Sequence, residues 1–418
     1  MSQSTNQFYK KLLKRYSRRI NLNLERIQKV LTVLSFPQLE LNQPINILGS
    51  DGKMSTLTAL KYFLQAHKKN VTTFTSPHLY DMRHRFWLKN RYITLEEIKK
   101  YTKIVESTGL KLTLFELLTT VYILAANKKK IHYHLIEAGL LFKKDSTNLW
   151  PEPKAQIITN INYQHQDWVN PQTLTEICNQ KLSSLSQNTT IYIAKQQPRT
   201  LRIIKRILKK NKSKKVYSSQ FGVEKINNYY FYKDQKYKIP IQSKSIHSEG
   251  LMNNLALSIK VALDFGVPKK TIIQTIPKIQ FEGRVQYLNK GKLKKMLKTN
   301  EKLLLDGCHS MASAKNLFNY LKTLKEPVYG IWGMQKNKLP ELFIKSFESI
   351  FEKIVTLTIP NEPHAIKAKK LKFIAQKFMP ADEASNIQTA LKKLSSEEKK
   401  TIVIFGSLYL IGDVLSKN

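Results

Sequence analysis

The chain has 418 residues, of which 42% are hydrophobic, so it can bury a sizeable core and form two or three domains. Its apolar runs all fall short of the roughly 20 residues that span a bilayer, which argues against a membrane protein. Its cysteines, Cys178 and Cys308, belong to no CxxC pair, which argues against a disulfide framework or a zinc ribbon. We expect a protein of the reducing cytoplasm.

The formal net charge of +40 would suit a nucleic-acid partner, because lysine and arginine neutralise phosphates. However, the lysines are scattered in short runs such as 128–130, and no RNP-like, zinc-finger or helix-turn-helix signature accompanies them. Abundant Lys, Asn, Ile, Tyr and Phe together are what A/T-rich codons produce. We therefore expect no specific nucleic-acid partner, no membrane partner and a monomer.

Residues 1–24 contain no acidic residue and predict a basic first helix, although their charge resembles that of an organelle transit peptide. From Asn21 onward, apolar residues at helical spacing predict a second helix, which Phe36 and Pro37 end. This second helix would lead into the opening strand of a sheet.

The segment Pro44 to Thr58, PINILGSDGKMSTLT, predicts a strand, a glycine-rich phosphate loop and a helix. Glycines can take positive φ and bring backbone N–H groups to a phosphate, a lysine adds a point charge, and a hydroxyl can reach magnesium. The spacing departs from the common P-loop, because Met54 intervenes between the lysine and the hydroxyl. The strand-turn-helix context still favours an ATP site over an ordinary turn, with the candidate residues Gly49, Ser50, Asp51, Gly52, Lys53, Ser55 and Thr56.

Residues 70–74 predict a second strand, which closes a strand-helix-strand unit of a parallel sheet and leads to the sequence SPHL. With GSDGKMS and SPHL, followed by the arginine of HRF, the chain resembles the folylpolyglutamate and dihydrofolate synthases, relatives of the Mur ligases, whose loop typically reads GTNGKGS. His84 stands where that family usually has glutamate. The resemblance implies substrate contacts for Ser76, Pro77, His78 and Arg85.

Residues 94–103 predict a surface helix, and Thr113 to Ala126 predicts a strongly apolar helix that begins LTLFELLT. The residues alone favour a core helix. Because its start resembles the family's LTxFE element, the resemblance implies that Thr113 and Phe115 face the pterin of the substrate, on which an aromatic ring can stack.

Residues 131–136 predict a strand that delivers Glu137, and the continuation EAGLLFKKDSTN resembles the family's EVGLGGRLDATN. A carboxylate at the carboxyl end of a parallel strand suits a hard cation, so Glu137 is a candidate magnesium ligand. The resemblance further implies that Lys143 and Asp145 contact the substrate.

Another strand is expected at 155–161, and the QHQDW that follows it resembles the family's DHtdW, which places His165 at the family's histidine. Farther on, LTEICNQK resembles a family helix whose lysine is carbamylated and approaches a second magnesium ion, which places Lys181 there. By their residue types alone, these would be a structural histidine and a solvated surface lysine. The resemblance implies two magnesium ions held by Ser55, Glu137, His165 and Lys181.

Strands are also expected within 186–195 and at 214–217, around a helix at 200–208, whereas 221–242 predicts loops or a hairpin. Asn254 lies in NNLALSIKVAL, which resembles a family helix whose asparagine approaches the adenine of ATP. The resemblance therefore adds Asn254 to the candidate nucleotide contacts.

The sequence FEGR resembles the family's PGR turn, so Arg284 would approach the ATP phosphates. A strand is expected at 302–305, and the following DGCHS resembles DGAHN, which implies nucleotide contacts for Asp306 and His309. GIWGMQKNK resembles the family's GxmxDK and implies a substrate contact for Lys338. The terminal TIVIFGSLYLIGDV predicts a buried strand, a glycine turn and a last helix.

The resemblance runs from about Asn21 to the end, and its motifs follow the family order. It implies an α/β fold with three parts. A Mur-ligase-like P-loop domain with a mostly parallel sheet, at 1–284, would bind ATP and pterin. A hinge at 285–299 would connect it to a smaller Rossmann-like glutamate ligase domain at 300–418.

The activity that the resemblance implies is the ATP-dependent joining of L-glutamate to a pteroyl or folate carboxylate through an acyl phosphate. In such a reaction, charge builds on phosphoryl oxygens and is stabilised by cations and by N–H donors. The catalytic candidates are Lys53, His165, Lys181, Arg284 and His309.

Three alternatives stay open at this point. A nucleic-acid binder would explain the charge but not the ordered motifs, and a Mur-type ligase with another acid and amine would share the mechanism. A catalytically degenerate paralogue is suggested by departures from the family pattern at Met54, Leu141, Phe142, Lys143, Ser310 and Leu339. Whether the acid substrate is dihydropteroate, a folate or both is also open.

Overall fold

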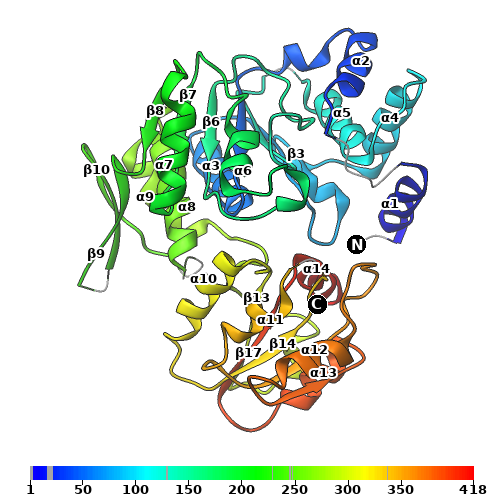
Figure 1. Ribbon diagram of the computed structural model, residues 1–418, viewed down its shortest axis with the longest axis vertical. Helices are drawn as coiled ribbons and strands as arrows, with labels where there is room; N and C mark the ends of the chain where they lie inside the picture. Colours follow the sequence, from blue (N-terminus) through cyan, green and yellow to red (C-terminus); the bar gives the residue numbers. More distant parts are fainter. Residues whose placement is uncertain are drawn as a thin grey trace. The chain divides into compact units, whose positions relative to one another are not determined.

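The computed structural model describes residues 3–16, 22–128, 130–227, 229–243, 246, 248–336 and 338–418. The chain forms two compact units, of which the first comprises Met1–Ser243 and Leu251–Ile279 and the second comprises Lys244–Gly250 and Gln280–Asn418 (Figure 1). Each unit contains a mostly parallel sheet and helices, so the expected α/β fold class is confirmed. The expected domain boundaries at 284 and 299 stay a prediction.

The main sheet of the first unit has the strand order β4-β3-β2-β5-β1-β6-β7-β8. Six of these strands run parallel, whereas β3 and β4 add an antiparallel edge. The central strands are buried along their whole length, which explains why most of their residues are apolar. The strands are β1 (Pro44–Leu48), β2 (Val71–Phe74), β3 (Phe86–Leu88), β4 (Arg91–Tyr92), β5 (Tyr133–Glu137), β6 (Ala155–Ile158), β7 (Thr190–Ile193) and β8 (Lys214–Tyr217).

The helices of the first unit begin and end close to the signals in the sequence. The expected basic first helix is α1 (Gln3–Arg15), and the apolar helix α5 (Leu114–Ala126) begins directly after Thr113. There Thr113 and Glu116 form a capping box, in which each side chain accepts a hydrogen bond from the backbone N–H of the other residue. The other helices are α2 (Glu25–Val33), α3 (Lys53–Ala66), α4 (Leu95–Glu106), α6 (Leu174–Leu182), α7 (Pro198–Ile207), α8 (Glu249–Asp264) and α9 (Lys269–Thr275).

The segment 221–242 forms a small antiparallel sheet of its own, with the order β11-β10-β9 (Figure 1). The strands are β9 (Phe221–Ile226), β10 (Tyr229–Asp234) and β11 (Lys238–Pro240). The hairpin that the sequence allowed is therefore present, and a third strand extends it. Phe221, Tyr232 and Ile239 are buried, so a few apolar side chains hold a segment that is otherwise polar.

The sheet of the second unit has the order β12-β13-β17-β14-β15-β16 and is parallel except for β12. Alternate residues of β13 and β17 enter two separate cores, as a strand buried on both faces requires. Helices α10, α11 and α12 contribute to one core, and α13 and α14 contribute to the other. The strands are β12 (Gln286–Tyr287), β13 (Glu301–Asp306), β14 (Val328–Trp332), β15 (Phe351–Thr356), β16 (Ala381–Glu383) and β17 (Lys400–Phe405), and the helices are α10 (Met311–Leu321), α11 (Pro340–Lys345), α12 (Ala368–Ala375), α13 (Ile387–Leu394) and α14 (Leu408–Lys417).

The end of the chain agrees with its sequence pattern. Strand β17 is buried throughout, Gly406 takes a φ of 105°, and α14 follows. Among the helices of the described residues, none is both long enough and apolar enough to cross a membrane.

The capping glutamate of α5 leads to a stability prediction. Glu116 is 3% exposed and accepts hydrogen bonds from the backbone of Thr113 at 2.7 Å and from the guanidinium of Arg26 at 2.6 Å. Glu116→Ala should lower the free energy of unfolding by about 2–3 kcal/mol, because the cap and a largely buried ion pair are lost together. Urea denaturation measures this, with Glu96→Ala in the exposed first turn of α4 as the control. Equal losses in the two variants would contradict the role of Glu116.

Candidate active site

The phosphate loop connects β1 to α3 and adopts a backbone that requires its glycines. Gly49 and Gly52 have φ values of 142° and 91°, and a Cβ atom at Gly49 would collide with the side chain of Thr159. The loop is held against the segment after β6, because the N–H groups of Ser50 and Asp51 donate to the carbonyl of Asn160 at 2.8 and 3.2 Å. The loop shape is thus set before any ligand is considered.

Lys53 and Ser55 occupy the first turn of α3. The ammonium of Lys53 donates to the carbonyl oxygens of Gly49 and Ser50 at 3.3 and 3.1 Å, so it lies over the loop. The hydroxyl of Ser55 donates to Gly52 and accepts from the amide of Asn254 on α8 at 2.8 Å. A Cβ atom at Gly52 would collide with the Asn254 amide, so Asn254 lies directly against the loop. Its contact with adenine stays a prediction.

Lys181 on α6 is brought to the same loop and is 1% exposed. Its Nζ atom donates to the carbonyl oxygen of Gly49 at 3.0 Å. Burial, and after it the nearby charge of Lys53, lowers the pKa of Lys181 to about 7. The interpretation of Lys181 as a solvated surface lysine, which its helix composition favoured, is therefore wrong. Ile177, Cys178 and Leu182 are buried with it on the inner face of α6.

Glu137 ends β5 and joins two of the sequence motifs. It is 3% exposed, and its Oε2 atom accepts a hydrogen bond from the backbone N–H of Ser76 at 3.0 Å. The parallel register pairs Ile47 with Glu137 and Phe74 with Ile136. The phosphate loop, the SPHL segment and Glu137 therefore meet at the carboxyl edge of the same sheet.

The SPHL segment is organised by a buried arginine. The Nε–H of Arg85, which is 8% exposed, donates to His78 Nδ1 at 2.9 Å. Burial, followed by the charge of Arg85, lowers the pKa of His78, so the ring is neutral and can accept this bond. The ring of Tyr9 on α1 lies edge-on to His78, with 4.9 Å between the ring centroids. Tyr9 was not among the residues predicted from the sequence, because residues 1–24 indicated only a basic helix.

Phe115 lies between a core residue and a glycine loop. Its ring stacks on Phe74 with the centroids 5.8 Å apart, and a Cβ atom at Gly139 would collide with it. Gly139 therefore allows the ring to approach the backbone after β5. Thr113 at the start of the same helix is the cap residue described above, and its contact with pterin stays a prediction, as does that of Phe115.

The loop after Glu137 is shaped by Asp145. This carboxylate is fully buried and accepts hydrogen bonds from the N–H groups of Leu140 and Thr147 and from the Thr147 hydroxyl. Burial raises the pKa of Asp145, while these hydrogen bonds oppose that rise. The observed role of Asp145 is to hold its loop, and Lys143 is exposed on the same loop. Substrate contacts of Asp145 and Lys143 stay predictions.

His165 lies directly after two residues whose side chains form hydrogen bonds to Asp51 of the phosphate loop. The side-chain amides of Asn162 and Gln164 donate to Asp51 Oδ2 at 2.6 and 3.1 Å. His165 itself is partly exposed and has a φ of 64°, a conformation uncommon outside glycine. Its turn is thereby attached to the phosphate loop through Asp51.

Three candidates of the second unit gather at Gly307, directly after β13. A Cβ atom at Gly307 would come within 3.0 Å of the guanidinium of Arg284, and the ring of His309 is hydrogen-bonded to the Gly307 carbonyl at 3.0 Å. The carboxylate of Asp306 accepts from the N–H groups of Val285 and Cys308, and burial raises its pKa while Arg284 opposes the rise. Lys338 lies elsewhere in this unit, in the connection from β14 to α11.

The metal-binding role of Ser55, Glu137, His165 and Lys181, implied by the sequence, stays a prediction. Among the described residues, no group of three or more His, Cys, Asp and Glu side chains could hold a metal ion. Glu137 and Ser55 offer the oxygen donors that magnesium prefers, and this ion commonly keeps water and phosphate oxygens as further ligands. The amine of Lys181 offers no such oxygen unless it is carbamylated. Glu137 and Ser55 therefore fit a magnesium site that a nucleotide completes.

Comparison with known proteins gives one consistent result. Residues 289–417 match the family model described as dihydrofolate synthetase, C-terminal domain. The whole chain is similar to the dihydrofolate synthetase of Saccharomyces cerevisiae, with 25% identity over 425 residues that cover 95% of this chain and 97% of the relative.

Solved structures with the same fold cover nearly the whole chain. The structure of E. coli FolC in complex with DHPP and ADP has a TM-score of 0.86 and 17% identity, and it covers 99% of this chain and 97% of that chain. The bifunctional folylpolyglutamate synthase/dihydrofolate synthase of Yersinia pestis, complexed with AMPPNP and Mn ion, has a TM-score of 0.84, 18% identity and the same coverage. At these identities the likeness concerns the fold.

The buried amine of Lys181 leads to a prediction about pH. Between about pH 7 and pH 10 the unfolded chain keeps a proton on Lys181 that the folded chain has released, so folding becomes more favourable as pH rises. Relative to Lys181→Met, the wild type should gain up to about 1.4 kcal/mol of stability per pH unit in this range. Urea denaturation in bicarbonate-free buffer measures the difference. Parallel curves for the two proteins would contradict the buried amine, and Lys103→Met, at an exposed position of α4, is the control.

Proposed function

We propose that this chain, which is similar over nearly its whole length to dihydrofolate and folylpolyglutamate synthases, is an ATP-dependent ligase that joins L-glutamate to the carboxylate of a pteroyl or folate compound. The observation that carries the proposal is the convergence of the phosphate loop, the SPHL segment and Glu137 at one edge of one sheet. Open parallel sheets bind ligands at this edge. The names of the relatives indicate a folate-type substrate. The phosphate loop and Lys53 indicate that the site binds the phosphates of a nucleotide.

The reaction requires activation of a carboxylate, which is a poor electrophile. Attack of the carboxylate oxygen on the γ-phosphorus of ATP forms an acyl phosphate and releases ADP. The amine of glutamate then attacks the acyl carbon, and phosphate leaves from the tetrahedral intermediate. The loop N–H groups and Lys53 are the groups of the first unit that would stabilise charge on the phosphoryl oxygens.

The nucleotide and its metal would be held by residues of the phosphate loop and by Glu137, whose backbone and side-chain contacts are described above. We assign the ATP phosphates to residues 49–56, and magnesium to Ser55 and Glu137, with His165 and a carbamylated Lys181 serving a second ion. Magnesium, when bound, would neutralise phosphate charge. The neutral fraction of Lys181 at pH 7 is the form that can react with carbon dioxide to give an anionic oxygen ligand. In the second unit we assign nucleotide contacts to Arg284, Asp306 and His309.

Two of the departures from the family pattern, Leu141 and Phe142, are compatible with catalysis. Phe142 is fully buried and belongs to the same core cluster as Ile177 and Cys178 of α6, so its bulk is absorbed by the core. Leu141 takes a φ of 59°, the backbone conformation that a glycine would adopt freely. These observations favour an active enzyme over a degenerate paralogue. We further propose that it acts in the cytoplasm as a monomer, on small molecules and without a nucleic-acid partner.

The direct test is ATP-dependent incorporation of labelled glutamate, with dihydropteroate and a folate monoglutamate supplied separately. We expect incorporation into at least one of them and none without ATP. Lys53→Ala should weaken ATP binding about tenfold or more while folding is kept, because the loop loses its mobile cation. Calorimetry measures that affinity. Incorporation into neither acid would overturn the proposed substrates, and unchanged ATP affinity in Lys53→Ala would remove the loop from the site.

Phe115 provides a test of the pterin side. Phe115→Ala should raise KM for the pteroyl substrate about tenfold and leave KM for ATP unchanged, because stacking is lost only at the ring. Phe115→Leu preserves apolar volume and should retain the fold if alanine does not. Should Phe115→Leu leave KM for the pteroyl substrate at the wild-type value, the stacking role is wrong.

A further inference from the structure

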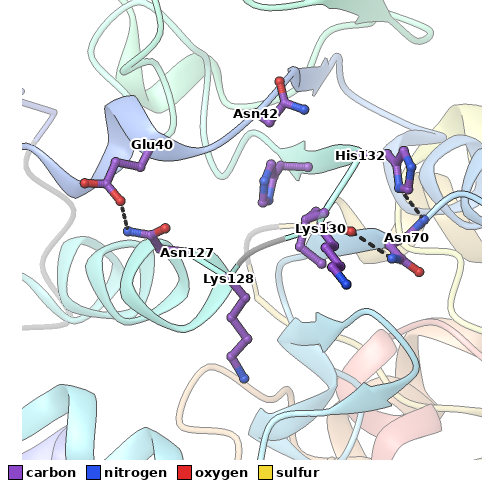
Figure 2. Close-up of a pocket in the computed structure, with 9 residues that line it drawn as sticks. Glu40, Asn42, Asn70, Asn127, Lys128, Lys130 and His132 are labelled. Carbon is purple, nitrogen blue, oxygen red and sulfur yellow. Dashed lines mark hydrogen bonds between the residues drawn. The ribbon is translucent and has the colours of Figure 1, made fainter.

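A cavity of about 700 Å³ opens at the amino-terminal edge of the main sheet of the first unit (Figure 2). Asn42 precedes β1, Asn70 precedes β2, and His132 precedes β5, and all three line the cavity. The same three strands lead, at their other ends, to the phosphate loop, the SPHL segment and Glu137. The cavity is therefore separated from the candidate active site by the length of the strands.

The ring of His132 has a defined tautomer in this wall. The backbone N–H of Asn70 donates to His132 Nδ1 at 3.0 Å, and the side-chain amide of Asn70 donates to the carbonyl of Lys130 at 2.7 Å. Figure 2 shows both of these hydrogen bonds, in which Asn70 is the donor. Because Nδ1 of His132 accepts a hydrogen bond, the proton of the neutral ring resides on Nε2.

A buried chain of hydroxyl groups allows His134 to take the same tautomer. Thr72 Oγ1 lies 2.7 Å from His134 Nδ1 and 2.7 Å from the hydroxyl of Tyr122. Tyr122 is fully buried and burial raises its phenol pKa, so the hydroxyl keeps its proton and can either donate to Thr72 or accept from it. When Tyr122 donates to Thr72, the Thr72 hydroxyl donates to His134 Nδ1, which leaves the proton of the neutral ring on Nε2.

The Nε2 atoms of both rings are available to the cavity. In the described part of the chain, neither atom has a hydrogen-bond partner. His134 is only 2% exposed, yet its Nε2 is not among the fully buried polar atoms that lack a partner, so it reaches the cavity that the residue lines. Burial lowers the pKa of His134 to about 4, so the ring is a neutral donor near pH 7.

The charges around the cavity favour an anion. The ammonium of Lys130 has no ion pair with any described residue, whereas Lys128 contacts Glu97 at 3.4 Å. The carboxylate in the wall, Glu40, accepts a hydrogen bond from the side-chain amide of Asn127 at 2.9 Å (Figure 2). A metal ion is disfavoured at His132, because a metal-binding histidine offers a lone pair at one nitrogen and donates from the other, whereas His132 Nδ1 already accepts from the backbone of Asn70.

We propose that this cavity is a second ligand site, which binds a small oxyanion of the phosphate or carboxylate class through the Nε2–H groups of His132 and His134 and the ammonium of Lys130. Both histidine donors are held in place by hydrogen bonds from the protein, so little ordering is needed on binding. A phosphate group and a carboxylate group present the same acceptor oxygens to these donors.

The test is a titration of the full chain with inorganic phosphate and, separately, with acetate, followed by NMR of the imidazole groups of His132 and His134. A saturable shift of both Nε2–H signals is expected with at least one anion, and the two titrations distinguish phosphate from carboxylate. Phosphate could also bind in the loop after β1, and Lys53→Ala weakens binding there. A shift that comes from the cavity should therefore persist in Lys53→Ala. Loss of the shift in that variant would overturn the proposal.

A pair of exposed lysines provides the matched comparison. Lys130→Gln should weaken the anion affinity about tenfold, because a charge-assisted hydrogen bond is removed. Lys111→Gln, also at an exposed position of the first unit, should bind as the wild type does. Equal affinities in both variants, absence of a saturable shift with either anion, or a shift produced only by zinc would overturn the proposal.

Discussion

The carbonyl oxygen of Gly49 is the point on which the candidate active site depends. Two amines, those of Lys53 and Lys181, donate to it from different helices. This arrangement requires the positive φ of Gly49, since any side chain there would collide with Thr159. Burial of Lys181, and after it the nearby charge of Lys53, lowers the pKa of Lys181. One backbone conformation thus determines the loop shape and presents the carbonyl oxygen that both amines contact.

The parallel sheet then determines which motifs can act together. Adjacent parallel strands end at the same edge, so β1, β2 and β5 deliver the phosphate loop, the SPHL segment and Glu137 to one place. The hydrogen bond from Ser76 to Glu137 joins two of these segments directly. At the opposite ends, the same strands expose the donor-lined cavity. The sheet therefore separates two polar regions by the length of its strands.

Much of this fold was accessible from sequence because its signals are local. A glycine turn between an apolar run and a helical pattern predicted β1, the loop and α3, and the strongly apolar run from Thr113 to Ala126 predicted α5. The three-stranded sheet at 221–240 was only partly expected, because its polar strands are stabilised by few buried side chains. Tyr9 could not be found in this way, since its contact with His78 joins α1 to a loop far along the chain.

The sequence by itself determined the order of the elements, the phosphate loop and the ordered motifs that indicate an ATP-dependent ligase, because each depends on residues that are close together in the chain. Only the tertiary structure decided the states of individual polar groups. Lys181 looks like a surface residue in its helix and is buried because α6 packs its inner face toward the sheet and the loop. His132 and His134 look like any two histidines near the start of a strand, and their hydrogen-bond partners, Asn70 and Thr72, come from the neighbouring strand and the residue before it. Burial and hydrogen-bond partners are properties of contacts between distant residues, and for that reason local sequence patterns do not contain them.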